Sequence, residues 1–405
     1  MSRRLAALRG DLDLFPSPDR ARPGLVIHDK NGFSDRQIIV PPLLLRALEV
    51  FDGELTDVDL RAALARATGD LDNTNLAAHL EQVLSESGFL RDEVFDRMRE
   101  ERFAAWRAVE QIEYSHAGPG NYPGDREGAE AALGTWFRKV EREAAEPVRA
   151  IAAPHASPEA VSDCYAAAYG SLAAGLSKAA ALDKTFVILG TSHYGDIDKL
   201  GTTARPFVTP FGTSAVDHTA LAAVRGPGAV EEDYYFSMEH SVEFQVVFLQ
   251  YLYGPDIRIL PLLCGSYARS IYLGGAPEDN DEVRRYLDRL GELNVKFGDR
   301  LVWVLGIDLA HVGRRYGDDR AYRAGDIAEV EARDRRRLAD IAGGRTEAFW
   351  ADVQEGQDPL NWCGSAPLYT FLRAVPSAKG RLLDYRGWQI DRDSVVTAGG
   401  LAFAP

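Results

Sequence analysis

The sequence has few cysteines and no long apolar run, and both absences narrow the class of protein. Only three cysteines occur in 405 residues, Cys164, Cys264 and Cys363. This odd, widely spaced set indicates free thiols in a reducing compartment, or one metal ligand, and not a disulfide framework. No apolar run approaches the length of a membrane span, and the basic start lacks the apolar segment of a signal peptide because Arg9 and Asp11 interrupt it. We therefore expect a cytoplasmic protein with no membrane partner.

Positive charge is also scarce, since 46 Lys and Arg stand against 61 Asp and Glu, for a net charge of −15. A nucleic acid or an anionic membrane surface would need a basic face, so neither is expected as a partner. The sequence contains no P-loop, no Gly-x-Gly-x-x-Gly after a strand and no Gly-x-Ser-x-Gly elbow. These absences remove the nucleotide, dinucleotide and α/β-hydrolase interpretations.

The first quarter of the chain predicts a small separate module. Residues 1–23 are polar, contain three prolines and are expected to form an arm. Residues 24–98 predict a winged-helix-like domain, in which Asn31-Gly32 signals a hairpin. Its expected elements are strands at 24–28 and 37–40, helices at 43–51, 60–66 and 76–84, and a wing strand at 87–91. Residues 99–113 are expected to form a connecting helix.

The function of this module has competing interpretations. A DNA-binding winged helix is one of them, but residues 1–100 carry 13 Lys and Arg against 18 Asp and Glu. DNA binders usually show a basic stripe, so this balance favours contact with a protein or peptide, or plain packing against the rest of the chain. The order of hairpin, helices and Gly-Phe-Leu resembles PqqD-like domains, which recognise peptides beside modifying enzymes.

Residues 114–405 alternate between apolar strand patterns and helical patterns, which indicates an α/β domain. The expected strands are 149–153, 185–189, 257–263, 301–306, 382–385 and 394–403. The expected helices are 127–146, 158–179, 215–225, 238–252, 280–297, 318–341 and 365–374.

Three of these strands run into a histidine just past their carboxyl ends, namely His155, His193 and His311. Ligands bind at that edge of an open α/β sheet. A single such histidine is more often a hydrogen-bonded loop residue, but three at one structural position suggest a shared site. Histidine is the commonest metal ligand and the usual general base near neutral pH. Two histidines and one anionic ligand can hold a divalent metal ion with positions open for substrate.

Candidates for the anionic ligand lie in three other stretches. Cys363 stands in a loop before a helix, whereas Cys264 and Cys164 are interpreted as small buried apolar residues. Asp308 and His311, three residues apart, could share one pocket with the carboxylate orienting an imidazole, or Asp308 could cap a helical turn with His311 incidental.

The stretch Glu239-His240-Ser-Val-Glu243 places two acids one helical turn apart, with His240 and Glu243 at a spacing of three. They could be metal ligands, as in di-iron carboxylate bundles, or a solvated first turn of a helix. The apolar residues that follow indicate a buried helix, so its charged start is expected to face a cleft.

Six short motifs, in order, resemble the Memo-like family, also called AmmeMemoRadiSam system protein B, over about residues 112–405. They are Ser115-His-Ala-Gly118 with Tyr122-Pro123, Ala153-Pro-His-Ala156, Ile188-Leu-Gly-Thr-Ser-His193, Glu239-His-Ser-Val-Glu243, Asp308-Leu-Ala-His311 and Cys363-Gly364. The resemblance implies the fold of class III extradiol dioxygenases, with a mixed central sheet flanked by helices. It also implies that His155, His193 and Cys363 are metal ligands.

Under this resemblance, Cys363 replaces the carboxylate ligand of extradiol dioxygenases, and His311 stands where those enzymes keep an acid/base histidine. Asp308, Glu239 and His240 would be neighbours of the catalytic pocket. The sequence departs from the family where Ser157-Pro158 replaces Gly-Tyr and where Gly306-Ile307-Asp308 replaces Ser-Ser-Asp. These changes alter the wall of the pocket and bear on which substrate it accepts.

Three functions follow from these expectations. The first is an iron(II) oxidoreductase of dioxygenase type acting on a small molecule or peptide, although a thiolate ligand also suits copper or zinc. The second is a non-catalytic metal-binding accessory protein whose N-terminal module engages a peptide or a radical-SAM or Ammecr-like partner. The third is a zinc hydrolase, since an open two-histidine site could activate water.

Overall fold

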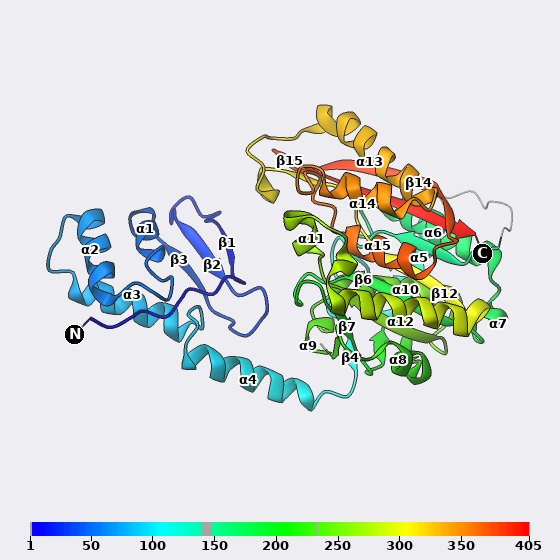
Figure 1. The fold of residues 1–405 in the computed structure, drawn as a ribbon, viewed down its shortest axis with the longest axis horizontal. Coiled ribbons are helices and arrows are strands. Elements are labelled where there is room, and N and C mark those ends of the chain that lie inside the picture. The colour runs from blue at the N-terminus through cyan, green and yellow to red at the C-terminus, as the bar shows by residue number, and fades with distance from the viewer. Residues whose placement is uncertain (1, 139–146, 232, 405) are drawn as a thin grey trace. The chain divides into compact units, whose positions relative to one another are not determined.

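A computed structural model describes residues 2–138, 147–231 and 233–404 (Figure 1). The chain divides into two compact units, Met1–Val109 and Glu110–Pro405. The larger unit is built on a mixed sheet flanked by helices, and the smaller unit contains a three-stranded antiparallel sheet. The predicted fold class, α/β with a small N-terminal domain, is confirmed.

The smaller unit begins with strands β1 (Asp13–Pro16), β2 (Leu25–His28) and β3 (Gln37–Val40), which pair antiparallel in that order. Helical segments follow: η1 (Pro42–Leu44), α1 (Leu45–Leu48), α2 (Asp57–Thr68), α3 (Thr74–Glu86) and α4 (Glu93–Arg107). Helix α2 starts at Asp57, before the expected residue 60, because the Thr56 backbone N–H donates to the Asp59 carboxylate at 2.8 Å, and it ends at Gly69 with φ 74°.

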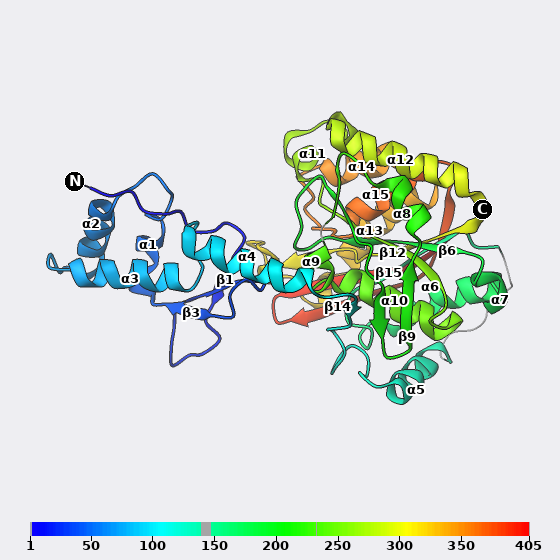
Figure 2. The same cartoon turned by 90° about the horizontal axis from the view of Figure 1, so that it is seen from below.

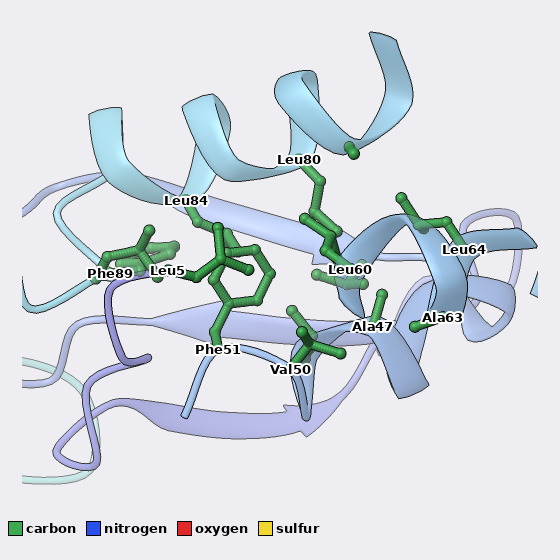
Figure 3. Packing of buried hydrophobic residues seen from close by; sticks show 14 of the residues in the cluster. Leu5, Ala47, Val50, Phe51, Leu60, Ala63, Leu64, Leu80, Leu84 and Phe89 are labelled. Atoms are coloured by element: carbon green, nitrogen blue, oxygen red, sulfur yellow. The ribbon is translucent and has the colours of Figure 1, made fainter. Parts of the chain in front are cut away.

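The core of the smaller unit lies between α2, α3 and the segments that lead into and out of them (Figure 3). Leu60 and Leu64 are spaced by one turn of α2, and Leu80 and Leu84 by one turn of α3. This spacing lines each apolar pair along one helix face, so both helices bury a stripe against the same cluster. Phe89 lies in that cluster too.

The connecting helix expected at 99–113 lies instead at Glu93–Arg107, and Ile112–Glu113 form a strand. Two further expectations for the smaller unit were wrong. Residues 1–23 do not form an arm, because β1 joins the sheet and Leu5 and Leu12 are buried in the core. Pro16 is tolerated because β1 is an edge strand. No wing strand forms at residues 87–91, where Leu90 makes only an isolated bridge to Leu8. The N-terminal segment instead pairs with that stretch through backbone hydrogen bonds, since the Arg9 backbone N–H donates to the Phe89 carbonyl at 2.9 Å.

The larger unit is organised around a parallel core of strands β5, β12, β6 and β11, in that spatial order. Strand β15 pairs antiparallel with β5 and carries β14 and β13, while β9, β8 and β4 continue beyond β11, and β7 and β10 pair beside it. The bounds are β4 Ile112–Glu113, β5 Ala150–Ala153, β6 Thr185–Thr191, β7 Leu200–Thr202, β8 Phe207–Thr209, β9 Gly212–Val216, β10 Ala229–Glu231, β11 Arg258–Cys264, β12 Leu301–Gly306, β13 His311–Gly313, β14 Lys379–Asp391 and β15 Ser394–Ala404.

Helices cover both faces of this sheet (Figure 2). Helices α6 and α10, with α5 beside them, contact the sheet on one face, and α15, with α12 and α14, covers the other. The bounds are α5 Arg126–Phe137, α6 Ser162–Gly175, α7 Lys178–Ala181, α8 His218–Val224, α9 Asp233–Phe236, α10 His240–Tyr253, α11 Ala268–Leu273, α12 Asp281–Phe297, α13 Ile327–Ala342, α14 Thr346–Gln354 and α15 Ser365–Ala374, with short 3-10 turns η2 Pro277–Asp279, η3 Gly298–Arg300, η4 Arg314–Tyr316 and η5 Ala324–Asp326.

The expected strands of the larger unit are confirmed, but several helix boundaries differ. The first residues of the helix expected at 215–225 belong to strand β9 instead. Helix α8 starts only at His218, where the Asp217 carboxylate accepts hydrogen bonds from the Thr219 and Ala220 N–H groups. The helix expected at 318–341 begins at Ile327. For the helix expected at 127–146, residues 139–146 lie outside the described part. Among the described helices, none has both the length and the apolar character required to cross a bilayer.

Candidate metal centre

The register of the parallel strands brings three loop starts to one edge of the sheet. Gly306 at the end of β12 pairs with Ala153 of β5 on one side and with Gly190 of β6 on the other. The carboxyl ends of the three strands therefore lie in one row. His155, His193 and Asp308 follow that row within two or three residues, so their side chains start from neighbouring points.

His155 is held in a defined orientation within the protein. Its side chain is 2% exposed, and Nδ1 lies 3.0 Å from the Gly306 carbonyl oxygen. Because a carbonyl only accepts, Nδ1 carries the proton and the lone pair is on Nε2. Nε2 lies 3.2 Å from the Cys363 sulfur. Burial lowers the pKa of His155, so the ring is neutral, as a metal ligand must be.

His193 is oriented by the carboxylate of Glu239. The His193 Nδ1 lies 3.0 and 3.1 Å from the two Glu239 oxygens, and the His193 backbone N–H donates to the same carboxylate at 2.9 Å. Burial opposes ionisation of Glu239, but the neighbouring imidazoles of His193 and His240 and the hydrogen bonds from His193 outweigh it and lower the pKa of this carboxyl to about 2. An ionised carboxylate on Nδ1 directs the lone pair of the ring to Nε2, as in carboxylate–histidine–metal triads.

Cys363 is brought to the same place by a loop with unusual backbone conformations. Three non-glycine residues, Gln357, Asp358 and Asn361, have φ angles of 61°, 55° and 48°. Such conformations cost on the order of 1–3 kcal/mol each and persist where the surrounding structure holds them. Burial raises the pKa of the Cys363 thiol well above its usual value. A metal ion would therefore have to displace the thiol proton.

The structure brings the three predicted ligands together. One ligand atom from each of His155, His193 and Cys363 lies within 4.8 Å of the others. The rings of His155 and His193 meet edge to face with centroids 5.1 Å apart. Two imidazole nitrogens and a sulfur converging on one point are a donor set that suits iron, zinc or copper, so the residues present fit a divalent metal ion.

The predicted neighbours Asp308 and His311 also lie at this point, where an Asp308–His311–Cys363 group satisfies the same 4.8 Å criterion. Asp308 does not cap a helical turn. Its Oδ1 accepts from the His155 and Ala156 N–H groups, both at 3.0 Å, and so fixes the loop after β5. His311 Nδ1 lies 3.2 Å from the Leu309 carbonyl, and burial lowers the pKa of this imidazole, which leaves a neutral ring with its lone pair on Nε2.

The charged start of α10 is buried, so the solvated alternative for Glu239 and Glu243 was wrong. His240, the first residue of α10, has its ring stacked on that of His193 at 5.1 Å and edge to face with that of His155 at 5.2 Å. Burial and the neighbouring histidines lower the pKa of His240 well below its usual value. A group formed by His193, Glu239 and His240 also satisfies the metal-ligand distance criterion.

Two glycines allow α10 to reach the strand ends. A Cβ on Gly306 would lie 2.2 Å from the Ser241 carbonyl oxygen, and a Cβ on Gly190 would lie 2.5 Å from the Ser241 hydroxyl. Any side chain at either position would push the first turn of α10 away from the sheet. These glycines at the carboxyl ends of β12 and β6 therefore let Glu239 and His240 join the histidines beyond them.

The sequence interpretation missed His116, whose ring lies 5.5 Å from that of His240. His116 Nδ1 is 2.8 Å from Glu243, which also accepts from the Tyr122 hydroxyl at 2.5 Å. Burial opposes the charge on His116, but Glu243 outweighs it and raises the pKa of this imidazole. The motif Ser115-His-Ala-Gly118 was the available signal, but no long apolar strand precedes it to mark the histidine as a site residue.

A cavity of about 270 Å³ opens beside the proposed ligands. His193 and Cys363 line it together with the aromatic side chains of Tyr272, Trp350 and Trp362. Cys264 contributes to the same wall but is itself buried, and Cys164 is buried as well, as predicted for both. The volume and the lining suit a small planar ligand.

Comparisons with known proteins agree with the arrangement of motifs. A family model described as Memo-like protein matches residues 113–402. A MEMO1 family protein of Aquifex aeolicus is 25% identical over 401 residues, which cover 96% of this chain and 98% of that protein. A MEMO1 family protein of Thermus thermophilus is 31% identical over 277 residues, which cover 66% of this chain and 74% of that protein.

Proposed function

The chain belongs to the Memo-like protein family, and on that premise we propose that it binds one divalent metal ion through His155, His193 and Cys363. The observation that carries this proposal is the convergence of the three donor atoms within 4.8 Å. Both rings hold a hydrogen-bond acceptor on Nδ1, which presents Nε2 as the ligand atom.

The electrostatics of the site support a cation. Glu239 and Asp308 are both buried, and the partners that the described residues provide for their carboxylates are histidine rings and backbone N–H groups, with no Lys or Arg among them. Buried carboxylates without a cationic partner are costly. A divalent ion would supply the missing positive charge.

For the reaction, we propose oxidation of dioxygenase type with iron(II). Bound iron(II) would supply redox chemistry and open positions for substrate and oxygen. The residues of the chain have separate tasks. His311, a neutral ring near Cys363, accepts a substrate proton at Nε2. Asp308 holds the loop that carries His155, and the aromatic wall orients a planar small molecule.

Metal analysis tests the site directly. Purified under anaerobic conditions, the wild-type protein should contain about one equivalent of metal, and His155→Ala, His193→Ala and Cys363→Ala should each lower that content. His218→Ala, at the start of α8, is a matched histidine control, because His218 belongs to none of the candidate metal-binding groups among the described residues. If the three variants retain wild-type metal content, the proposed site is wrong.

Oxygen consumption tests the reaction. Iron(II)-loaded protein should consume oxygen with at least one member of a panel of catechols, and His311→Ala should slow that reaction while metal content stays near one equivalent. Metal content that is zinc alone, with no oxygen uptake after iron loading, would contradict the oxidoreductase proposal.

A second function is a metal-binding accessory role without turnover, in which the N-terminal unit engages a radical-SAM or Ammecr-like protein or a peptide. Two observations favour it. Residues 1–109 form a compact unit with its own core, and the match to the Aquifex protein extends over both units. Retained metal without oxygen uptake would support this role, and loss of partner binding on removing residues 1–109 would locate the contact.

A further inference from the structure

Asp334 is a buried acid in the middle of α13, and the carboxylate is fully enclosed. Three side chains donate hydrogen bonds to it: Trp362 Nε1 at 2.7 Å, the Tyr385 hydroxyl at 2.8 Å and the Thr397 hydroxyl at 2.6 Å. Acidic side chains are rarely buried so completely. The elements that these three donors come from indicate what Asp334 connects.

The first connection runs to Cys363. Trp362 is the residue before Cys363, and its backbone N–H donates to the Asp358 carboxylate at 3.0 Å. Arg337, one turn after Asp334 on α13, donates to the same Asp358 at 2.6 Å. Helix α13 thus holds both ends of the loop in which Gln357, Asp358 and Asn361 have positive φ angles. Backbone strain of this kind persists only where neighbours fix it.

The second connection runs to His311. The Thr397 hydroxyl that donates to Asp334 also accepts from the Ala310 N–H at 2.8 Å. Ala310 directly precedes His311, whose own N–H donates to the Leu360 carbonyl of the strained loop at 2.8 Å. One carboxylate therefore lies between the segment with the proposed thiol ligand and the segment with the proposed proton acceptor.

We infer that Asp334 is a positioning residue, which fixes the Cys363 loop relative to the Ala310–His311 segment and thereby sets the place of the thiol beside the two histidines. The consequence for metal binding rests on the proposed function, whereas the position of the thiol does not. A contribution to folding stability does not by itself explain why an acid occupies position 334. Burial raises the pKa of Asp334 to about 6 and so disfavours the charge that this carboxylate carries at neutral pH.

The experiment compares Asp334→Asn and Trp362→Phe with Tyr385→Phe in the full chain. Tyr385→Phe is the comparison variant, since Tyr385 belongs to β14, outside the Cys363 loop and the Ala310–His311 segment, and its hydroxyl donates one of the three hydrogen bonds to the carboxylate. In metal-free protein, alkylation of Cys363 is followed by mass spectrometry, with buried Cys264 as the internal measure of general opening. In metal-loaded protein, cobalt(II) affinity and the thiolate-to-cobalt charge-transfer band are measured.

Asp334→Asn and Trp362→Phe should change the alkylation rate of Cys363 several-fold without changing that of Cys264. They should also weaken cobalt(II) binding about tenfold or more and reduce the charge-transfer band, while Tyr385→Phe stays near wild type. An unchanged rate at Cys363, or an equal change at Cys264, overturns the inference. If wild-type protein binds no cobalt(II), the proposed function fails, and the alkylation rates still decide the role of Asp334.

Discussion

Replacing Glu239 by Gln should weaken metal binding by about 10- to 100-fold, the range found when a carboxylate that orients a ligating histidine is lost. Glu239 holds His193 at two points, the ring Nδ1 at 3.0 Å and the backbone N–H at 2.9 Å. It also accepts from the Ser241 N–H at 3.1 Å at the start of α10. A glutamine has one oxygen and one amide group in place of two acceptors, so an N–H donor must face another donor.

The magnitude follows from that mismatch. Leaving one buried donor without an acceptor costs about 1–3 kcal/mol, and a 10- to 100-fold loss of affinity corresponds to about 1.4–2.8 kcal/mol. The cost of the unpaired donor and the expected loss of metal affinity are therefore of the same size. We expect the first to appear as the second, because His193 must turn to relieve the mismatch, and a turned ring no longer presents Nε2 beside Cys363. We therefore expect most of the cost in metal affinity and a smaller part in the free energy of unfolding.

Glu243→Gln provides the matched control on the same helix. Glu243 is also buried and holds a histidine through Nδ1, but that histidine is His116, which is not a proposed ligand. Anaerobic competition titrations against a chromophoric chelator would measure both affinities, with thermal unfolding of the metal-free proteins alongside. Equal losses in the two variants, or wild-type affinity in Glu239→Gln, would refute the assignment of His193.

Four further predictions address the fold and the chemistry of the site. Gly306→Ala should lower the free energy of unfolding in urea by about 1–3 kcal/mol, because the new Cβ would lie 2.2 Å from the Ser241 oxygen; unchanged unfolding would show that α10 can shift freely. Burial raises the pKa of Asp334 from 3.8 to about 6, so the native state favours its protonated form, and that stabilisation is present below pH 4 and lost as the pH rises through 6. The stability of wild type relative to Asp334→Asn should therefore fall by about 2 kcal/mol between pH 4 and 7 in urea titrations; a difference independent of pH would be inconsistent with this. Cys363→Asp should keep iron(II) better than copper(I) in competition experiments, since a carboxylate is a harder ligand than a thiolate; the reverse order would argue against a direct bond from residue 363. A chain starting at Glu110 should retain wild-type metal affinity, because all proposed ligands lie in the larger unit; loss of affinity would mean that the N-terminal unit contributes to the site.

The sequence by itself determined the strands of the larger unit and the residues that follow them. The runs at 185–189 and 301–306 are short, apolar and bounded by glycine, and they form β6 and β12 almost as predicted. Such strands are recognisable because burial on both faces demands continuous apolar sequence. Since parallel strands end at one edge of a sheet, the sequence predicts the histidines beyond them as a group.

Elements whose partners are distant in sequence were less predictable. Residues 13–16 contain Asp and Pro, which strands disfavour, whereas residues 87–91 were expected to form a strand. The tertiary structure decided the opposite, since the first segment enters the sheet and the second does not. Entry into a sheet depends on backbone hydrogen bonds, which every residue except proline can donate. Amino-acid composition therefore says little about which segment will pair.

The supporting residues of the site were decided by tertiary structure alone. His116, Asp334 and the paired roles of Glu239 and Glu243 follow from hydrogen bonds between elements far apart in the chain. An acid at the start of a helix looks the same in sequence whether water or a histidine is its partner. What distinguishes the two cases is burial, because a carboxylate removed from water must find its partners in the protein. Here the packing of α10 against β6 and β12, together with the segment from Ser115 to Tyr122, removes these carboxylates from water.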